Sequence, residues 1–369
     1  MSHTEQLVKE AAELSIKELE KRFEELQQKI HKRSLFMNFG TFINSYILHR
    51  VGLHITKPEI VNQLAGSMIS PQGYWSYSGS FWSFLHKPDE WNKVYKMLAD
   101  DYSKVVFDWF IKYRTATMMA QSAIADDLYP FKPLIKLRGQ PRIQKHVLSN
   151  SFIVKGLKIK GVDVDILRDT FDYNQYSYHN IVEAKAGDVV IDAGAYRGDT
   201  PLYFSLKVRE KGIVYAFEPD NENYVYLEKN IKLNNLKNIK SIKAGIGSKN
   251  TIAHEMGIKS GVTLKGEDDS NGELGNIKVY SIDNFISENK INRVDFIKMD
   301  IEGWELDALK GAEKCLKQYK PQLAICVYHK PEDLLNIANY LKMIVPDYKL
   351  YLDQKSSSWT ETILYAKIY

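Results

Sequence analysis

The chain has few of the features that mark secreted, membrane-spanning or nucleic-acid-binding proteins. It has only two cysteines, Cys315 and Cys326, in 369 residues, and their spacing does not suit a metal site. We therefore expect buried thiols in a reducing compartment, and we assign no metal ligands. The first residues lack the basic and apolar blocks of a signal peptide. The formal charge of +4 is too small to favour nucleic acid. These absences predict a cytoplasmic protein.

Long apolar runs are also missing. The most apolar early stretch, residues 35–51, is interrupted by two asparagines, a histidine and an arginine, whose polar groups would need partners in lipid. We therefore expect no membrane span. A content of 44% hydrophobic and 26% charged residues is ordinary for a globular protein. The length allows a large catalytic domain and a smaller one.

The N-terminal part is predicted to be helical. Residues 5–33 lack Gly and Pro and carry one apolar stripe at helical spacing, formed by Ile16, Leu19, Phe23, Leu26 and Ile30. The stripe fits either a dimerising coiled coil, and so a homodimer, or a surface helix packed on its own domain. Its shortness favours the surface helix. Residues 90–113 predict one long helix or two shorter ones.

An aromatic cluster at residues 73–82 precedes that helix. Exposed aromatic side chains can stack on a sugar, but in a small helical domain most belong to the core, and we favour the core. Pro130, Pro133 and Pro141 then mark a connection, and residues 152–167 alternate like a strand or hairpin. We therefore divide this half into a helical region, 1–130, with an acceptor-binding or oligomerisation role, and a connecting segment, 131–180.

From residue 181 to 369, strands alternate with helices. Short apolar runs suited to a buried parallel sheet lie at 189–191, 213–217, 239–244, 296–299 and 323–328. Helical stretches at 201–210, 222–234, 304–316 and 331–341 separate most of them. Two last strands, 348–352 and 361–368, have no helix between them and predict an antiparallel hairpin at the sheet edge. The pattern predicts a doubly wound α/β domain.

A glycine-bearing turn follows the first of these strands. It contains Asp192, Gly194, Ala195, Tyr196, Gly198, Asp199 and Thr200. Glycines there allow backbone to approach a ligand at the carboxyl end of the sheet. The G-x-G-x-x-G spacing of dinucleotide sites is absent, and the two carboxylates would repel a pyrophosphate. They suit a ligand with an ammonium and a sulfonium, as in S-adenosylmethionine.

The next two strands extend this predicted cofactor site. The second ends in Glu218 and Pro219, which places a carboxylate where it can accept hydrogen bonds from both ribose hydroxyls. The third is followed by Gly245 and Ile246, in a segment that is either a loop flanking the adenine or an ordinary glycine-rich connection.

Acids and a histidine follow the fourth and fifth strands. Asp300 and Glu302 come after the fourth, and His329 after the fifth, so all three belong to the same edge of the sheet. His329 could take a proton from an acceptor hydroxyl, with Asp300 and Glu302 orienting it or acting as the base themselves. The alternative is structural hydrogen bonding by each of them.

These residues resemble the FkbM family of methyltransferases. The matching pieces run in family order at 190–195, 198–200, 216–219, 295–303, 309–312 and 327–329. The resemblance covers about half the chain, from roughly residue 188 to the C-terminus. It implies the class I methyltransferase fold, a Rossmann-like seven-stranded sheet, here with an N-terminal helical domain. It also implies methyl transfer to a hydroxyl of a carbohydrate, glycolipid or natural product.

The leading functional expectation is therefore an S-adenosylmethionine-dependent O-methyltransferase with a small-molecule or glycan acceptor. Methylation of RNA or protein is a second possibility, which the modest charge does not favour. A non-catalytic subunit that binds S-adenosylmethionine is a third. The complete set of Asp300, Glu302 and His329 favours catalysis.

Overall fold

The computed structural model describes residues 1–32, 71–120, 130, 143–146, 151–258, 261–265, 276–355 and 361–369. Contacts divide the chain into two compact units, Met1–Asp89 with Asp108–Pro130, and Glu90–Phe107 with Phe131–Tyr369. The predicted boundaries at residues 130 and 180 stay predictions. Among the described helices, none is long and apolar enough to cross a lipid bilayer. The interrupted apolar run at 35–51 lies outside the described residues.

The first unit is helical. It contains α1 (His3–Lys32), α4 (Pro71–His86) and most of α6 (Asp101–Ala120). Residues 90–113 form two helices rather than one, because α5 (Pro88–Met97) ends before α6 begins. The start of α1 is held to α6 by a hydrogen bond between His3 and Asp108 at 2.8 Å and by an ion pair between Lys112 and Glu10 at 2.6 Å.

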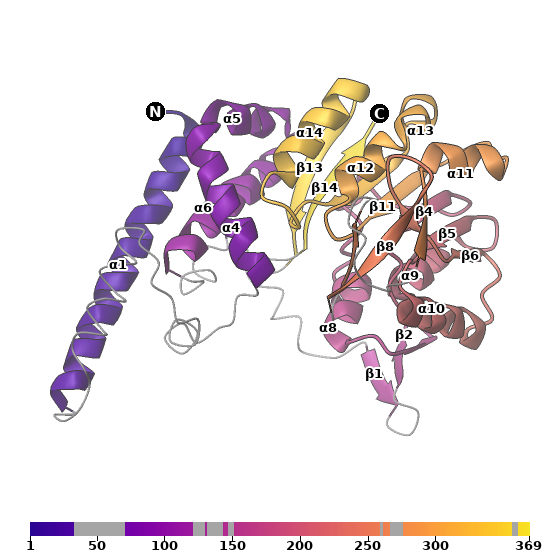
Figure 1. The fold of residues 1–369 in the computed structure, drawn as a ribbon, viewed down its shortest axis with the longest axis horizontal. Helices are drawn as coiled ribbons and strands as arrows, with labels where there is room; N and C mark the ends of the chain where they lie inside the picture. Colours follow the sequence, from indigo (N-terminus) through magenta and orange to yellow (C-terminus); the bar gives the residue numbers. More distant parts are fainter. Residues whose placement is uncertain are drawn as a thin grey trace. The chain divides into compact units, whose positions relative to one another are not determined.

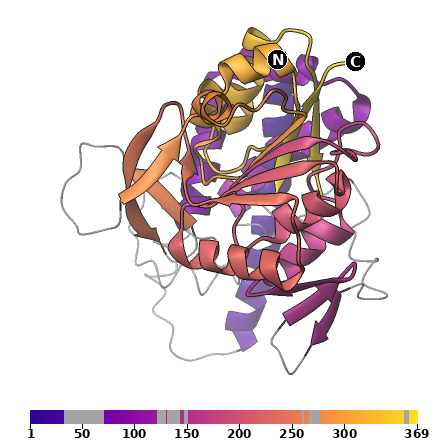
Figure 2. The same ribbon diagram turned by 90° about the vertical axis from the view of Figure 1, so that its right-hand side faces the viewer.

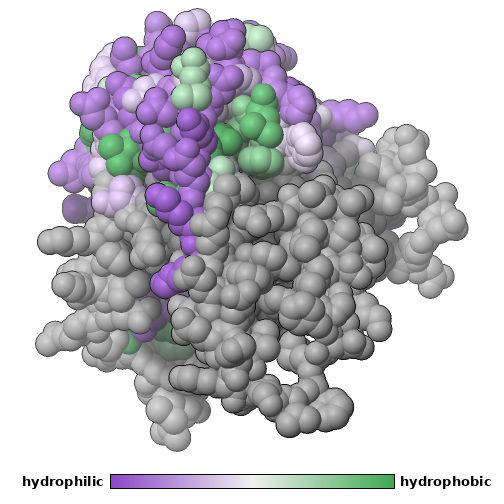
Figure 3. All heavy atoms as spheres, turned by 90° about the vertical axis from the view of Figure 1, so that its left-hand side faces the viewer, coloured by the Kyte–Doolittle hydropathy of each residue, from purple (hydrophilic) through white to green (hydrophobic). Residues whose placement is uncertain are grey.

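The face drawn in Figure 3 is mainly hydrophilic where it is coloured, with hydrophobic patches between hydrophilic side chains. Near the start of α1, Leu7, Val8 and Ala11 are buried. The side chains of the predicted stripe lie outside the described part. Within the aromatic cluster, Trp82 is 58% exposed. Phe84, just beyond the cluster, is buried. The two interpretations of that cluster therefore stay open.

The second unit is built on a seven-stranded sheet in the order β13-β14-β12-β11-β4-β5-β6, with helices on both faces (Figures 1 and 2). Its strands are β4 (Val189–Ala193), β5 (Ile213–Phe217), β6 (Ile239–Ile242), β11 (Phe296–Met299), β12 (Gln322–Cys326), β13 (Lys349–Gln354) and β14 (Thr362–Lys367). β14 runs antiparallel to both neighbours, as the terminal hairpin predicts. The other pairings are parallel. Fully buried strands such as β11, which is apolar except for Lys298, suit this arrangement.

The helices that join the strands agree with the predicted ranges to within a few residues, except Ile282–Glu288, which no predicted helix covers. They are α9 (Asp199–Val208), α10 (Asn221–Leu233), α11 (Ile282–Glu288), α12 (Glu305–Lys310), α13 (Glu313–Tyr319) and α14 (Asp333–Ile344). The stretch 304–316 forms two short helices instead of one. Before the sheet come β1 (Ile143–His146), β2 (Ser151–Val154), β3 (Leu157–Lys160), α8 (Val164–Leu167) and the π-helix η3 (Arg168–Asp172). The predicted hairpin at 152–167 is therefore β2–β3, followed by helix.

A smaller four-stranded sheet lies beside the large one in this unit (Figure 2). Its order is β7-β10-β8-β9, from β7 (Gly245–Ile246), β8 (Thr251–Ile258), β9 (Gly261–Lys265) and β10 (Asn276–Tyr280). Ala253, Ile277 and Val279 form its small apolar cluster, and Trp304 packs against them. Trp304 follows the acids at the end of β11, so this sheet supports the loop that carries them.

Candidate active site

The turn after β4 requires glycine. Gly194 has a φ of +83°, and a Cβ there would lie 1.8 Å from the carbonyl oxygen of Asp300. Its amide and that of Ala195 donate to the Phe217 carbonyl, at 3.0 and 2.9 Å. Gly198 has a φ of +102° and precedes α9. The turn is thus fixed between the carboxyl ends of β5 and β11, where an open α/β sheet binds ligands.

Beneath this turn lies a buried ion pair. A carboxyl oxygen of Asp192 is 3.2 Å from Nζ of Lys298, and both side chains are almost fully buried. The Thr200 hydroxyl donates to the other oxygen at 2.7 Å. Burial raises the pKa of Asp192. Burial alone would lower the pKa of Lys298, but the charges of Asp192 and Asp300 outweigh it and hold that pKa above its ordinary value.

Lys298 is a functional residue that the sequence reasoning missed. Its ammonium also lies 3.3 Å from the Ala193 carbonyl oxygen and 5.1 Å from the Tyr176 ring centre. It therefore holds the glycine turn and balances the acids around it. The available signal was a lysine inside the otherwise apolar run of β11, because a charge in a buried strand needs partners.

Two further acids of the predicted cofactor site are buried without an ion pair. Asp199 accepts a hydrogen bond from the Thr170 hydroxyl at 3.0 Å, and burial raises its pKa to about 6. Its other carboxyl oxygen has no hydrogen-bond partner among the described residues. Glu218 is 6% exposed, and burial raises its pKa to about 8. The Asp220 amide donates to Glu218 at 2.9 Å. Both acids retain acceptor capacity for a ligand.

Gly245 and Ile246 form β7 and are not a free loop. They pair with Val279 and Tyr280 of β10 in parallel. The loop prediction was wrong for these two residues, because the pairing partner lies more than thirty residues later in the chain. A Cβ at Gly311 would lie 2.2 Å from the Gly247 carbonyl oxygen, so this region is packed closely against the α12–α13 junction.

At the other end of the site, Asp300 is held by two tyrosines. The hydroxyls of Tyr176 and Tyr328 donate to its two carboxyl oxygens at 3.1 and 3.2 Å. Burial would raise the pKa of Asp300, but the charges of Lys298 and His329 outweigh it and hold the pKa below its ordinary value. Asp300 is therefore a stable carboxylate and a poor proton acceptor.

His329 lies between carboxylates on both sides of its ring. Nδ1 is 3.0 Å from a carboxyl oxygen of Glu305, and Nε2 is 3.4 Å from Asp300 and 3.8 Å from Glu302. The side chain is 9% exposed. Burial alone would lower the pKa of His329, but these carboxylates, with Glu305 first, raise it to about 10. These carboxylates favour the protonated ring, whereas the predicted role of His329 as a base needs the neutral ring; that role stays a prediction.

Glu302 is the most exposed acid of this group. Its side chain is 45% exposed and its φ is +56°, a left-handed conformation uncommon outside glycine. Burial raises its pKa, the charge of His329 opposes that rise, and the charges of Asp300 and Glu305 add to it. Glu302 combines access to solvent with an increased affinity for a proton.

Glu305 was not predicted as a site residue. It begins α12, is fully buried, and accepts a hydrogen bond from the Ile301 amide at 2.8 Å. Ligand atoms of Glu305, Asp300 and His329 all lie within 4.8 Å of one another, so these residues could hold a metal ion in place of the imidazole proton. In the sequence, Glu305 stands three residues after Glu302 at a helix start, and no pattern there predicts its contact with His329.

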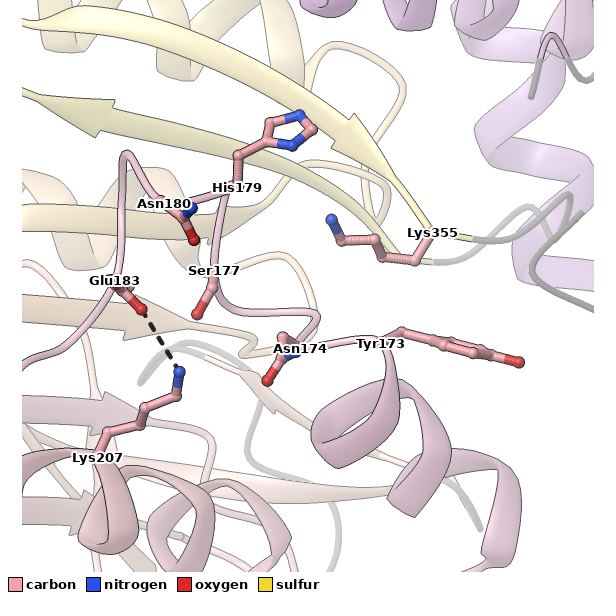
Figure 4. A pocket seen from close by; sticks show the side chains of 8 residues that line it. All are labelled: Tyr173, Asn174, Ser177, His179, Asn180, Glu183, Lys207 and Lys355. Carbon is pink, nitrogen blue, oxygen red and sulfur yellow. Dashed lines mark hydrogen bonds and ion pairs between the residues drawn. The ribbon is translucent and has the colours of Figure 1, made fainter. Parts of the chain in front are cut away.

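A polar pocket of about 190 Å³ lies apart from the predicted residues (Figure 4). It is lined by Tyr173, Asn174, Ser177, His179, Asn180, Glu183, Lys207 and Lys355. Across it, Nζ of Lys207 lies 3.5 Å from a carboxyl oxygen of Glu183. None of the predicted cofactor or catalytic residues belongs to this pocket.

Comparison with known proteins agrees with this geometry. Residues 192–349 match the family model of the Methyltransferase FkbM domain. "Methyltransferase 1" of Beauveria bassiana is 25% identical over 34% of this chain and 58% of its own length. "Methyltransferase sdnD" of Sordaria araneosa is 24% identical over 37% and 64%. The crystal structure of Methyltransferase FkbM from Methylobacillus flagellatus KT is 22% identical, with a TM-score of 0.53, over 77% of this chain and 60% of that one.

The strand order and the ligand-facing edge define the class I methyltransferase fold, a Rossmann-like sheet with an antiparallel edge pair. Within that class, the chain carries an FkbM methyltransferase domain over residues 192–349, as the resemblance implies. The chain spans about three fifths of the length of the relatives it matches.

Proposed function

We propose that this chain is an S-adenosylmethionine-dependent methyltransferase acting on a hydroxyl of a carbohydrate, glycolipid or natural product. The observation that carries the proposal is the buried pair of unmatched acids, Asp199 and Glu218, beside the glycine turn of an FkbM domain. Neither acid has an ion-pair partner, and one carboxyl oxygen of Asp199 has no donor among the described residues. A buried acceptor of this kind is costly, and a ligand rich in donors would satisfy it.

Glu218 would accept hydrogen bonds from the ribose hydroxyls, because it follows β5 at the ligand-binding edge. The turn around the methionine part of the cofactor would be formed by Asp192, Gly194, Ala195, Tyr196, Gly198, Asp199 and Thr200. Pro219, Gly245 and Ile246 would lie on the adenine side. Asp199 would face the ammonium. A sulfonium and an ammonium make this cofactor cationic, which suits a group with more acids than cations.

The methyl group would then face Asp300, Glu302 and His329 at the ends of β11 and β12. Methyl transfer is a direct displacement, so alignment of acceptor oxygen, methyl carbon and sulfur provides much of the rate. Two tyrosine hydroxyls on Asp300 and the ion pairs of His329 support a rigid arrangement. A cytoplasmic location and a glycan or small-molecule acceptor belong to the same proposal.

The test has a binding arm and a turnover arm. We expect S-adenosylhomocysteine to bind the purified full chain with one site in calorimetry, and labelled S-adenosylmethionine to release product over a panel of sugars, glycolipids and polyketides. Binding without turnover on every acceptor class, including RNA and protein, would favour a non-catalytic subunit. Absence of binding would reject the proposal.

A further inference from the structure

We infer that Thr170 is a positioning residue of the cofactor site, whose hydroxyl holds one oxygen of Asp199 and leaves the other to accept the ammonium of S-adenosylmethionine. An ammonium is present only if this cofactor is the ligand, so the role of Thr170 rests on the proposed function. The family match begins at residue 192, and Thr170 therefore belongs to a segment before the FkbM domain. The cofactor site is thereby extended to the π-helix that precedes the large sheet.

The carboxyl group of Asp199 is only half satisfied within the chain. Asp199 is the first residue of α9 and is 3% exposed. One of its oxygens, Oδ2, accepts a hydrogen bond from the Thr170 hydroxyl at 3.0 Å. The other, Oδ1, is buried and has no hydrogen-bond partner among the residues that the structure describes. A buried acceptor without a donor is costly, so this oxygen favours a ligand that supplies one.

The neighbouring acid, Asp192, shows what a complete arrangement of this kind contains. One oxygen of Asp192 accepts a hydrogen bond from the Thr200 hydroxyl at 2.7 Å. The other lies 3.2 Å from the ammonium of Lys298. Asp199 has the same threonine hydroxyl on one oxygen, from Thr170, and no ion pair on the other among the described residues. The missing partner is therefore a cation, and the ammonium of the cofactor has the same chemistry as the lysine side chain.

The π-helix η3 fixes Thr170 against α9. Its hydrogen bond from the Tyr173 amide to the Arg168 carbonyl, at 2.9 Å, spans five residues. Such segments are rare and occur frequently at functional sites. Phe171 is fully buried and packs edge-on against Tyr203 of α9, with ring centres 5.8 Å apart. Two adjacent side chains, Thr170 and Phe171, therefore attach η3 to α9 at the end that carries Asp199.

Threonine suits this role because its side chain is stiff. A β-branched residue has few accessible rotamers, so a hydroxyl that is 99% buried keeps one direction. Burial raises the pKa of Asp199 to about 6, and the charge of Lys298 and the hydrogen bond from Thr170 oppose this rise. The carboxyl group is therefore mainly ionised at pH 7. An ionised carboxylate with one oxygen held in place can form a charged hydrogen bond to the ammonium without reorientation.

The deciding experiment is calorimetric titration of the full chain with two ligands. One is S-adenosylhomocysteine, and the other is its deaminated analogue, in which hydrogen replaces the amino group. We expect Thr170→Val to weaken binding of S-adenosylhomocysteine by about tenfold and to leave binding of the analogue within about twofold. Thr170→Ser, which keeps the hydroxyl, should restore most of the affinity. Thr115→Val is the matched control, because Thr115 is equally buried in α6 and its hydroxyl has no hydrogen-bond partner among the described residues.

Equal loss of affinity for both ligands in Thr170→Val would overturn the inference, because Thr170 would then act only on the fold. Unchanged affinity for S-adenosylhomocysteine in that variant would overturn it as well. If circular dichroism shows that Thr170→Val is unfolded, Thr170→Ala removes the same hydroxyl without an apolar branch against Asp199, and the same comparison decides. Absence of binding to the wild type would reject the proposed function together with this role. Wild-type binding that is insensitive to Thr170 rejects the role alone.

Discussion

The carboxyl ends of β4 and β5 differ from those of β11 and β12 in how their acids are balanced. After β4 and β5, Asp199 and Glu218 are buried without an ion pair, and burial raises the pKa of each. After β11, Asp300 lies among Lys298, His329 and two tyrosines, and its pKa is lowered. Asp199 and Glu218 therefore have no cation paired with them, whereas Asp300 already lies beside cations of the protein.

This difference suggests that one end of the site binds the cofactor and the other supports methyl transfer. An incomplete end gains most from a ligand that supplies hydrogen-bond donors and positive charge, as the proposed cofactor does. A paired end changes little when the ligand arrives, which is the preorganisation expected where a methyl group is transferred. Changes at the first end should therefore affect binding, and changes at the second should affect stability or turnover.

The largest expected effect comes from breaking the buried pair under the glycine turn. Lys298→Met leaves Asp192 buried without its cation, so the free energy of unfolding should fall by about 3–5 kcal/mol. Urea denaturation followed by circular dichroism measures this. Adding Asp192→Asn to the same chain should recover part of the loss. A cost below about 1 kcal/mol for Lys298→Met would show that the pair does not support the fold.

The next effect concerns cofactor affinity. Glu218→Ala should weaken S-adenosylhomocysteine binding by at least about 10- to 150-fold, because a single hydrogen bond to a charged group contributes about 1.5–3 kcal/mol. The domain should remain folded. Glu222→Gln is the control, since Glu222 is an exposed acid paired with Arg197 in the same region. Equal affinities for wild type and Glu218→Ala in calorimetry would remove Glu218 from the cofactor site.

The pH dependence of binding sharpens the comparison further. The ionised form of Glu218 accepts the ribose hydrogens, so with a pKa of about 8 in the free protein the wild-type affinity should rise by up to about 50-fold between pH 6 and pH 8. Without ligand the sign is opposite. The folded pKa of about 8 exceeds the ordinary 4.5, so the Glu218 contribution to stability is present at low pH and lost as pH rises towards 8. Glu218→Gln should remove both trends, and a flat wild-type profile argues against this titration.

The smallest effect is expected from the N-terminal unit. Deleting residues 1–33 should leave affinity for S-adenosylhomocysteine within about twofold, because α1 belongs to the helical unit and contributes no residue to the candidate site. The deletion should lower the stability of the helical unit, since it removes buried Leu7, Val8 and Ala11. A large loss of affinity would show that α1 supports the cofactor site.

Local patterns in the sequence were enough to predict most of the large sheet. The runs 213–217 and 296–299 match β5 and β11 residue for residue, because strands buried on both faces are almost wholly apolar. The smaller sheet was missed. β8 mixes polar and small residues with apolar ones, and its pairing with β10 is a tertiary contact without a local pattern.

The candidate site was predictable in position and not in protonation. Strand ends bring Asp300, Glu302 and His329 to one edge, and the structure brings all three together. Glu305, the acid that raises the pKa of His329 most, approaches from the start of a helix to 3.0 Å from Nδ1. A histidine's pKa follows from all its neighbours, and sequence order gives only some of them.

The most direct test of the central claim is a crystal structure of the chain with S-adenosylhomocysteine. The account predicts the ribose hydroxyls on Glu218, the amino group near Asp199, and the sulfur facing the group of Asp300, Glu302 and His329. A nucleoside bound elsewhere, or one whose sulfur points away from that group, would contradict it.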